Sequence, residues 1–325
     1  MKVIQAKSAG FCYGVQRAVE LAEQTARERG GCVMLGSIIH NAHVVQHLEQ
    51  LGAHQVAGPE EIRPGDTVLI RAHGEKKQVI GHLKDIGAEC VDATCPNVLR
   101  VQQIVAQADA EGRVPIIIGD PNHPEVMGVA SWSAHSVVFE GAEALQRWLD
   151  EDPARRELPL TAVAQTTCIR IIWDGAAEIL KKQCTNAKIF DTICNATHKR
   201  QSEAAELASQ VDVMVVVGDR KSANTKHLTE ICSRQCPAVY QIERAEELKR
   251  DFLTGCSVAG LTAGASTPAG IIKEVYTTMS EEIKTMEPTE ESFEEMLEKS
   301  FKTLNTGEKV TGIVTAVGPT EVQVD

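Results

Sequence analysis

The sequence is poor in aromatic residues and contains no long apolar run. Aromatic side chains make up 4% of its 325 residues, so a folded core must be filled largely by valine, isoleucine, leucine and alanine. No apolar run approaches the roughly 20 residues of a membrane span, and the N-terminal MKVIQAKSAG lacks the apolar segment of a secretory signal. A formal net charge of −12 disfavours binding of nucleic acid along a basic face. We therefore expect a cytoplasmic protein with no membrane partner.

Common cofactor and metal motifs are missing as well. No G-x-G-x-x-G follows an expected strand and no G-x-x-x-x-G-K-[ST] occurs, which disfavours a dinucleotide site and a P-loop. The C-x2-C pairs of structural zinc sites are also absent. Ten cysteines nevertheless remain to be explained. They are too few for a disulfide scaffold in a chain of this length, and they indicate metal or redox chemistry.

The fold class follows from alternating strands and helices. Up to about residue 280, short valine- and isoleucine-rich runs alternate with amphipathic helical segments, which is the pattern of parallel α/β units. The run at 211–217 is almost entirely apolar, as expected for a strand buried on both faces. The pattern predicts an α/β protein with small parallel sheets in three modules, at 1–95, 96–192 and 193–280.

Three cysteines share one local setting. Cys12, Cys95 and Cys194 each follow a short extended segment, open an amphipathic helix and precede a basic residue by five positions. The exposed amides of a helix N-terminus lower the pKa of a thiol and prepare it as a metal ligand. Successive members of this set are separated by about one module. The other seven cysteines do not share the setting.

Polar residues follow the expected strands in every module. Ligands of parallel sheets bind at the carboxyl ends of strands, so these side chains should face one site. The candidates are His40, His73, His123, Glu125, Thr166, Ser222, Asn224 and Ser266. The set suits a small, highly anionic ligand such as a diphosphate. A diphosphate would raise the pKa of Glu125 and let it carry a proton, while His123 could relay that proton or bind a phosphate oxygen.

Two metal groups fit the three cysteines. Three thiolates match three corners of a [4Fe–4S] cluster and leave one iron without a protein ligand. Such an iron can act as a Lewis acid beside a substrate hydroxyl. A zinc ion held by three cysteines and a histidine is the alternative. Zinc accounts for the cysteines alone, whereas the cluster accounts for them together with an anion pocket.

The motifs together resemble those of one family. Residues 1–280 contain GFCYGVQRA, IIHN, RAHG, DATCP, HPEVMG, QTT, DTICNAT, GDRKSAN and TAGAST. This set resembles the 4-hydroxy-3-methylbut-2-enyl diphosphate reductases, the last enzymes of the methylerythritol phosphate route to isoprenoid precursors. The resemblance implies a cloverleaf of three α/β modules around a central [4Fe–4S] cluster. It also implies reductive removal of a hydroxyl group with two electrons and two protons, giving isopentenyl and dimethylallyl diphosphates.

The resemblance further implies a role for each candidate residue. Cys12, Cys95 and Cys194 would hold the cluster, Glu125 would deliver a proton and Thr166 would position the hydroxyl. The diphosphate would be bound by His40, His73, His123, Ser222, Asn224 and Ser266. Ala223 departs from the family, many of whose members have a second serine there. Ferredoxin or flavodoxin is the implied electron donor, because no flavin or nicotinamide motif suggests an internal one.

Residues 281–325 differ in composition from the rest. The stretch 281–304 is rich in glutamate and is expected to be an acidic linker. Residues 305–325 are similar to the first strands of the OB-type RNA-binding repeats that are fused to some bacterial members of the family. An OB barrel needs about five strands, of which about two fit here, so we expect a truncated repeat that does not bind RNA.

Three other functions remain open. A cluster-bearing redox sensor would need neither Glu125 nor Thr166, and it would need no diphosphate pocket. An RNA-binding protein with a reductase-like scaffold is disfavoured by the acidic charge and the incomplete repeat. A zinc hydrolase would hold zinc in place of iron.

Overall fold

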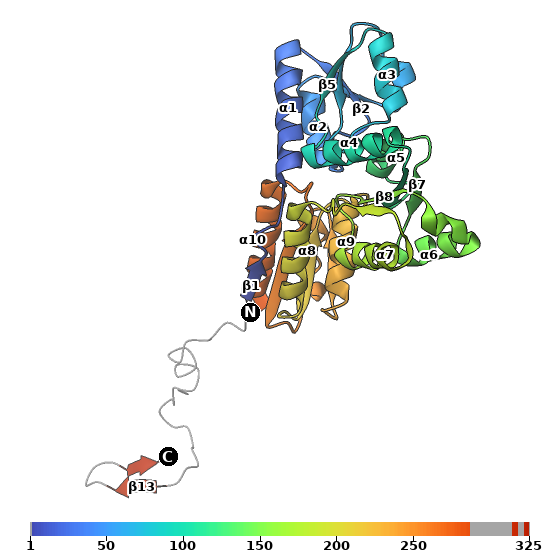
Figure 1. Ribbon diagram of the computed structural model, residues 1–325. Coiled ribbons are helices and arrows are strands. Elements are labelled where there is room, and N and C mark those ends of the chain that lie inside the picture. The colour runs from blue at the N-terminus through green and yellow to red at the C-terminus, as the bar shows by residue number, and fades with distance from the viewer. Residues whose placement is uncertain (1, 287–313, 318–321, 325) are drawn as a thin grey trace. The chain divides into compact units, whose positions relative to one another are not determined.

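A computed structural model describes residues 2–286, 314–317 and 322–324 of the chain. The chain forms two compact units, Met1–Lys284 and Thr285–Asp325. The first unit contains three four-stranded sheets, each with its own helices, and we call each sheet with its helices a lobe (Figure 1). Within the described ranges, no helix combines the length and the hydropathy that crossing a membrane requires.

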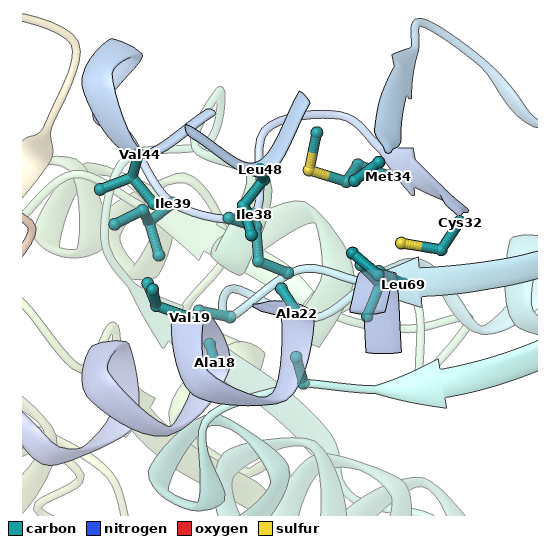
Figure 2. Close-up of a cluster of buried hydrophobic side chains, with 14 residues drawn as sticks. Ala18, Val19, Ala22, Cys32, Met34, Ile38, Ile39, Val44, Leu48 and Leu69 are labelled. Carbon is teal, nitrogen blue, oxygen red and sulfur yellow. The ribbon is translucent and has the colours of Figure 1, made fainter. Parts of the chain in front are cut away.

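The first lobe is a parallel sheet with helices on both faces. Its elements are α1 (Tyr13–Arg29), β2 (Cys32–Leu35), α2 (Ala42–Gln50), β3 (Ala53–Val56), η1 (Pro59–Glu61), β4 (Thr67–Ile70), α3 (Lys77–Asp85) and β5 (Glu89–Asp92), and its strand order is β3-β2-β4-β5. On one face, Val19 and Ala22 of α1 lie in a cluster with Ile38 and Leu48 (Figure 2). On the other face, Leu83 of α3 is buried in a second cluster. Apolar side chains on both faces explain why the two central strands, β2 and β4, are buried along nearly all of their length.

The second lobe repeats this plan. Its elements are α4 (Pro96–Ala110), β6 (Val114–Ile118), α5 (Pro124–Ala130), β7 (Val137–Phe139), α6 (Ala142–Glu151), η2 (Pro153–Glu157), β8 (Leu160–Ala164), α7 (Arg170–Gln183) and β9 (Ala187–Ile189), in the strand order β7-β6-β8-β9. Ile117 and Val163 lie in a cluster with Val101 of α4, while Ile118 lies in a cluster with Trp173 of α7. Adjacent residues of a strand thus point to opposite faces of the sheet, as the two-residue period of a β-strand requires.

The third lobe has the same plan but takes one strand from the N-terminus of the chain. Its other elements are α8 (Asn195–Ala208), β10 (Val213–Val217), α9 (Ala223–Ser233), β11 (Val239–Ile242), η3 (Ala245–Glu247), η4 (Arg250–Phe252), β12 (Val258–Ala263) and α10 (Ala269–Met286). The strand order is β1-β12-β10-β11, where β1 is Lys2–Gln5. Residues of α8 and α9, including Leu207 and Leu228, pack against Val216 in one cluster.

The position of β1 differs from the expected boundary, which assigned residue 1 onward to the first module. β1 pairs in parallel with β12, with Lys2 opposite Val258 and Gln5 opposite Leu261. In Figure 1 the blue strand β1 accordingly lies beside the orange helix α10. It fills the place in its sheet that β5 and β9 fill in the other two sheets. Short-range patterns do not reveal this pairing, because the partner strand lies at the other end of the unit.

Each of these equivalent strands leads to one of the three cysteines. β1 precedes Cys12 and α1, β5 precedes Cys95 and α4, and β9 precedes Cys194 and α8. All three cysteines are the N-cap residues of their helices, which confirms the expected helix starts. Each helix then packs into the core of the next lobe. The three cysteines therefore lie at the three crossings between lobes.

The region after residue 280 matches its expected boundaries in part. Helix α10 continues to Met286, so the first residues of the expected linker 281–304 are helical. In the second unit, β13 (Val314–Val317) and β14 (Val322–Val324) pair in an antiparallel arrangement. The remaining parts of the expected linker and of the expected OB-type repeat lie outside the described residues.

Candidate active site where the three lobes meet

One cavity is lined by all of the cysteines and strand-end residues that the sequence predicts to form a site. It encloses about 710 Å³ of space, part of it open to solvent. Its lining includes Cys12, Cys95, Cys194, His40, His73, His123, Glu125, Thr166, Ser222, Asn224 and Ser266. Residues that are far apart in the sequence meet here because each lobe contributes one helix start and two strand ends.

The three cysteines form the thiol side of the cavity. All three are free and half-buried. Gly14, in the first turn of α1, allows the first and second lobes to approach, because a Cβ atom at this position would lie 2.4 Å from the sulfur of Cys95. Three free thiols at helix N-termini are a donor set that suits a metal ion or an iron–sulfur cluster.

The backbone ties each cysteine to a polar loop in the same way. The amide of Cys12 donates to the carbonyl of Ala265 at 3.3 Å, that of Cys95 to Ala72 at 2.9 Å, and that of Cys194 to Thr166 at 3.0 Å. The accepting residues follow β12, β4 and β8, which are equivalent strands of the three sheets. The threefold repeat inferred from the cysteines thus extends to the backbone around them.

Electrostatics around the thiols favour a bound cationic centre. Burial raises the pKa of the Cys95 thiol, the amides of Asn97 and Val98 partly oppose this, and Cys12 and Cys194 raise the pKa further. Three thiolates crowded together repel one another, and metal ions of opposite charge relieve that repulsion. The residues present therefore fit a thiolate-bound metal group.

Three histidines form part of the polar lining of the same cavity, which we call its polar side. Ring centroids are separated by 4.7 Å for His40 and His73, 5.3 Å for His73 and His123, and 6.1 Å for His40 and His123. Burial lowers the pKa of His40, lowers that of His123 to about 4, and, with its two neighbours, holds that of His73 well below its usual range. At neutral pH the three rings are consequently uncharged, and each has one N–H group to donate.

The tautomer of His123 distinguishes an anion site from a metal site. Potential ligand atoms of the three rings all lie within 4.8 Å of one another, a spacing that also raises the possibility of a bound metal ion. However, Nδ1 of His123 accepts a hydrogen bond from the amide of Glu125 at 3.1 Å, so the neutral ring carries its proton on Nε2. A protonated ring nitrogen donates to oxygen and cannot ligate a metal. This arrangement favours an anion.

Glu125 is the one buried carboxyl group of the site and is 2% exposed. One of its oxygens accepts from the amide of Thr166 at 2.6 Å and the other from the hydroxyl of Thr166 at 2.9 Å. Burial raises the pKa of Glu125 to about 7 against the opposing effect of these two bonds. The direction agrees with the prediction, and burial produces it before any diphosphate is bound.

Several buried polar atoms of the cavity have no hydrogen-bond partner within the described residues. They are His40 Nε2, His73 Nδ1, Asn224 Nδ2 and Oδ1, Ser266 Oγ and Thr167 Oγ1. Buried polar groups in native proteins are nearly always hydrogen-bonded, so a group of unpaired ones indicates a missing ligand. Ser222 caps α9, where its hydroxyl accepts from the amide of Thr225 at 3.4 Å. Ala223 also lines the cavity and has no side-chain donor.

Other lining residues were not singled out from the sequence. The polar ones among them are Thr197, Asn97 and Arg200. The sequence pattern places a basic residue five positions after each cysteine, and after Cys12 this residue is Arg17. Arg17 does not line the cavity but donates to the carbonyls of Thr94 and Asp92. The basic residue that reaches the cavity is Arg200, six positions after Cys194. Its neighbour Lys199 is exposed, and only the helical phase distinguishes the two.

Comparisons with known proteins find similar sequences over most of the chain. The family model described as "LytB protein" matches residues 3–280. The 4-hydroxy-3-methylbut-2-enyl diphosphate reductase of Caldanaerobacter subterraneus subsp. tengcongensis is 39% identical over 297 residues, which is 90% of this chain and 100% of that protein. The enzyme of the same name from Nitratiruptor sp. is 38% identical over 276 residues, which is 85% of this chain and 97% of that protein.

Two solved structures are also similar. One is titled as the structure of (E)-4-hydroxy-3-methyl-but-2-enyl diphosphate reductase, the terminal enzyme of the non-mevalonate pathway. It has a TM-score of 0.63 and 37% identity, and the alignment covers 86% of this chain and 100% of that chain. The other, the E-1-hydroxy-2-methyl-but-2-enyl-4-diphosphate reductase of Plasmodium falciparum, has a TM-score of 0.80 and 26% identity, with 85% and 87% covered.

Proposed function

The chain belongs to the LytB protein family, and on that premise we propose that it is a 4-hydroxy-3-methylbut-2-enyl diphosphate reductase. The reaction removes the substrate hydroxyl as water, consumes two electrons and two protons, and gives isopentenyl or dimethylallyl diphosphate. One observation supports this function above the others: a single cavity joins three thiols at helix starts to a wall of anion-binding groups and a buried carboxyl.

The thiol side would hold the redox group. We assign Cys12, Cys95 and Cys194 as ligands of a [4Fe–4S] cluster, because three free thiols converge on the cavity from three lobes. When bound, such a cluster supplies electrons and one iron without a protein ligand, which acts as a Lewis acid. A zinc ion would use the same thiols but would leave the anion-binding wall and Glu125 unexplained.

The polar side would bind the diphosphate. The N–H groups of neutral His40, His73 and His123 can donate to phosphate oxygens, and the approach of the anion raises the pKa of each ring. The third lobe adds Ser222, Asn224 and Ser266 at the start of α9 and after β12. Because hydrogen bonds to ionised oxygens are roughly twice as strong as neutral ones, this wall would fix the charged end of the substrate.

Glu125 and Thr166 would deliver the proton that leaves with the hydroxyl. With a pKa near 7, the buried carboxyl group is about half protonated at neutral pH. In the substrate-free site the Thr166 hydroxyl donates to the carboxylate. Once Glu125 is protonated this bond reverses, so that Glu125 donates to Thr166 Oγ1 and the hydroxyl can donate its own hydrogen into the cavity. Protonation converts a poor leaving group, hydroxide, into water. The second proton of the reaction ends on a carbon atom of the product.

The electrons would come from a separate protein. The sequence contains no nicotinamide or flavin motif, so we propose a small electron carrier of the cytoplasm, a ferredoxin or a flavodoxin.

For residues 305–325 we propose the opening strands of an OB-type repeat, which the antiparallel pair β13 and β14 supports. We expect no RNA binding, since the formal net charge of −12 disfavours a nucleic-acid partner. Filter binding of the full chain at low salt would test this, because nonspecific affinity for RNA is highest there.

Anaerobic turnover tests the proposed function. Protein purified without oxygen is supplied with the allylic diphosphate and dithionite-reduced methyl viologen, and both products and the metal content are measured on the same sample. We expect both diphosphate products and about four irons per chain. Full iron content without product would favour a redox sensor. Zinc in place of iron would favour a hydrolase.

A further inference from the structure

A buried arginine lies between the first and third lobes, beside two of the three cysteines. Arg200 is 3% exposed and lines the cavity, although it belongs to none of the groups assigned above. It lies on α8, less than two turns after Cys194, which caps that helix. Burying a charged side chain costs free energy unless the charge is paired, so a buried arginine is expected to have compensating partners.

Arg200 joins the helix that begins at Cys194 to the segment that leads to Cys12. Its Nε donates to the carbonyl of Ser8 at 3.0 Å and its Nη2 to the carbonyl of Gly10 at 2.7 Å. Glu203, one turn further along α8, accepts from the amides of Lys7 and Ser8 at 2.6 and 2.8 Å. Four hydrogen bonds from two charged side chains therefore fix residues 7–10 against α8.

The charge of Arg200 interacts with two of the three cysteines. Burial lowers the pKa of its guanidinium group, while Cys12, Cys194 and Glu203 raise it, and Cys95 is absent from these neighbours. A guanidinium group stays protonated in proteins. Its Nη1 is buried and has no partner within the described residues. Glu203 accepts its hydrogen bonds at 2.6 and 2.8 Å from backbone amides and not from Arg200. Cys12 and Cys194, once deprotonated by a bound metal group, would supply further countercharge for Arg200.

We propose that Arg200 is a positioning residue for the redox group held by the three cysteines. It fixes Cys12 relative to Cys194, and its positive charge stabilises the reduced, more negative form of that group. The inference rests on the proposed function, because it requires a redox group at the thiols. Two nitrogens of the planar guanidinium group donate to the carbonyls of Ser8 and Gly10, and the third is left without a partner among the described residues. Lysine has a single nitrogen and cannot reproduce this geometry.

The chain offers a matched control in Arg113, a second buried arginine. Arg113 is 8% exposed and donates to Thr161, Asn186 and the carbonyl of Leu160 within the second lobe. It therefore makes similar hydrogen bonds but does not line the cavity. Replacing it should affect stability without affecting the redox group.

The reduction potential of the iron-loaded protein tests the proposal. Dithionite adds one electron to the bound group, no atoms are transferred, and the reduced fraction is followed by electron paramagnetic resonance. In Arg200→Gln we expect the reduction equilibrium constant to fall about tenfold, a shift of about 59 mV to more negative potential. Arg200→Lys should change it less than about twofold, since the charge is retained, and Arg113→Gln should not change it.

The rate of iron loss to a chelator distinguishes the two proposed effects of Arg200, which are fixing Cys12 relative to Cys194 and supplying positive charge. Arg200→Lys keeps the charge but cannot bridge the carbonyls of Ser8 and Gly10, so we expect it to lose iron several times faster than Arg113→Lys. This comparison also decides the matter if Arg200→Gln holds no iron. Unchanged potential in Arg200→Gln, or iron loss from Arg200→Lys no faster than from Arg113→Lys, would overturn the inference. Absence of an iron–sulfur group from the unmutated protein would instead refute the proposed function.

Discussion

The thiol side of the cavity repeats one residue type in all three lobes, whereas the polar side has different residues in each lobe. On the thiol side the same residue occurs three times, in the same N-cap position and with the same backbone bond to a neighbouring loop. On the polar side the equivalent loops differ: the residue after the accepting carbonyl is His73 in one lobe, Thr167 in another and Ser266 in the third. Repetition suits a symmetric group such as a cubane cluster, whereas diversity suits an asymmetric substrate.

The largest expected effect removes the thiol side. Cys12→Ser, Cys95→Ser and Cys194→Ser should each reduce the iron content from about four per chain to nearly none, because a cluster with only two protein ligands is not retained. Cys232→Ser and Cys236→Ser are the controls, since both thiols are buried in the core of the third lobe. Iron analysis after anaerobic reconstitution measures this. Full iron in any of the first three variants would break the ligand assignment.

A second variant should impair turnover while leaving the iron content of the thiol side unchanged. Glu125→Gln keeps the thiols and the shape of the wall but removes the transferable proton, so we expect normal iron content and a kcat lower by about 10²–10⁴. Glu75→Gln is the matched control, because Glu75 is also buried but forms an ion pair with Arg71 at 2.8 Å. Near-normal turnover by Glu125→Gln would remove this carboxyl from the mechanism.

A smaller effect is expected from the wall itself. His73→Ala removes a donor to an ionised oxygen, a loss of about 1.5–3 kcal/mol, which corresponds to a KM roughly 10- to 150-fold higher. Iron content should not change. The exposed His82 on α3 serves as the control. An unchanged KM, together with unchanged inhibition by inorganic pyrophosphate, would show that the histidines do not bind the diphosphate.

The smallest effect comes from pH. Because the acid form of Glu125 is the active one and its pKa in the substrate-free protein is about 7, kcat/KM should fall roughly fivefold between pH 7 and 8. Glu125→Gln should lack this limb of the profile. The folded chain also binds more protons than the unfolded chain between the ordinary pKa of 4.5 and about 7. The contribution of Glu125 to stability therefore decreases as pH rises through that window, which urea unfolding of the metal-free protein would measure.

Local patterns predicted the thiol side well. The N-cap cysteines, the helices after them and the parallel strands all depend on neighbouring residues, which a sequence displays directly. Strand ends predicted the polar residues for the same reason, since they meet wherever parallel strands share an edge.

Features that depend on distant contacts could not be predicted. β1 joins the third sheet because its partner is β12, at the other end of the unit. Arg200 gains its place from the carbonyls of Ser8 and Gly10, which no pattern near residue 200 reveals. The proton on His123 depends on a single backbone bond, and the raised pKa of Glu125 depends on burial by the whole lobe.

The central claim is that three thiols from three lobes hold a four-iron cluster whose remaining iron faces the polar wall. Mössbauer spectroscopy of protein loaded with isotopically enriched iron, recorded without and with the allylic diphosphate, tests it most directly. We predict that about one quarter of the iron signal changes when substrate is added and that about three quarters does not. An equal response of all the irons, or no response from any of them, would contradict the account.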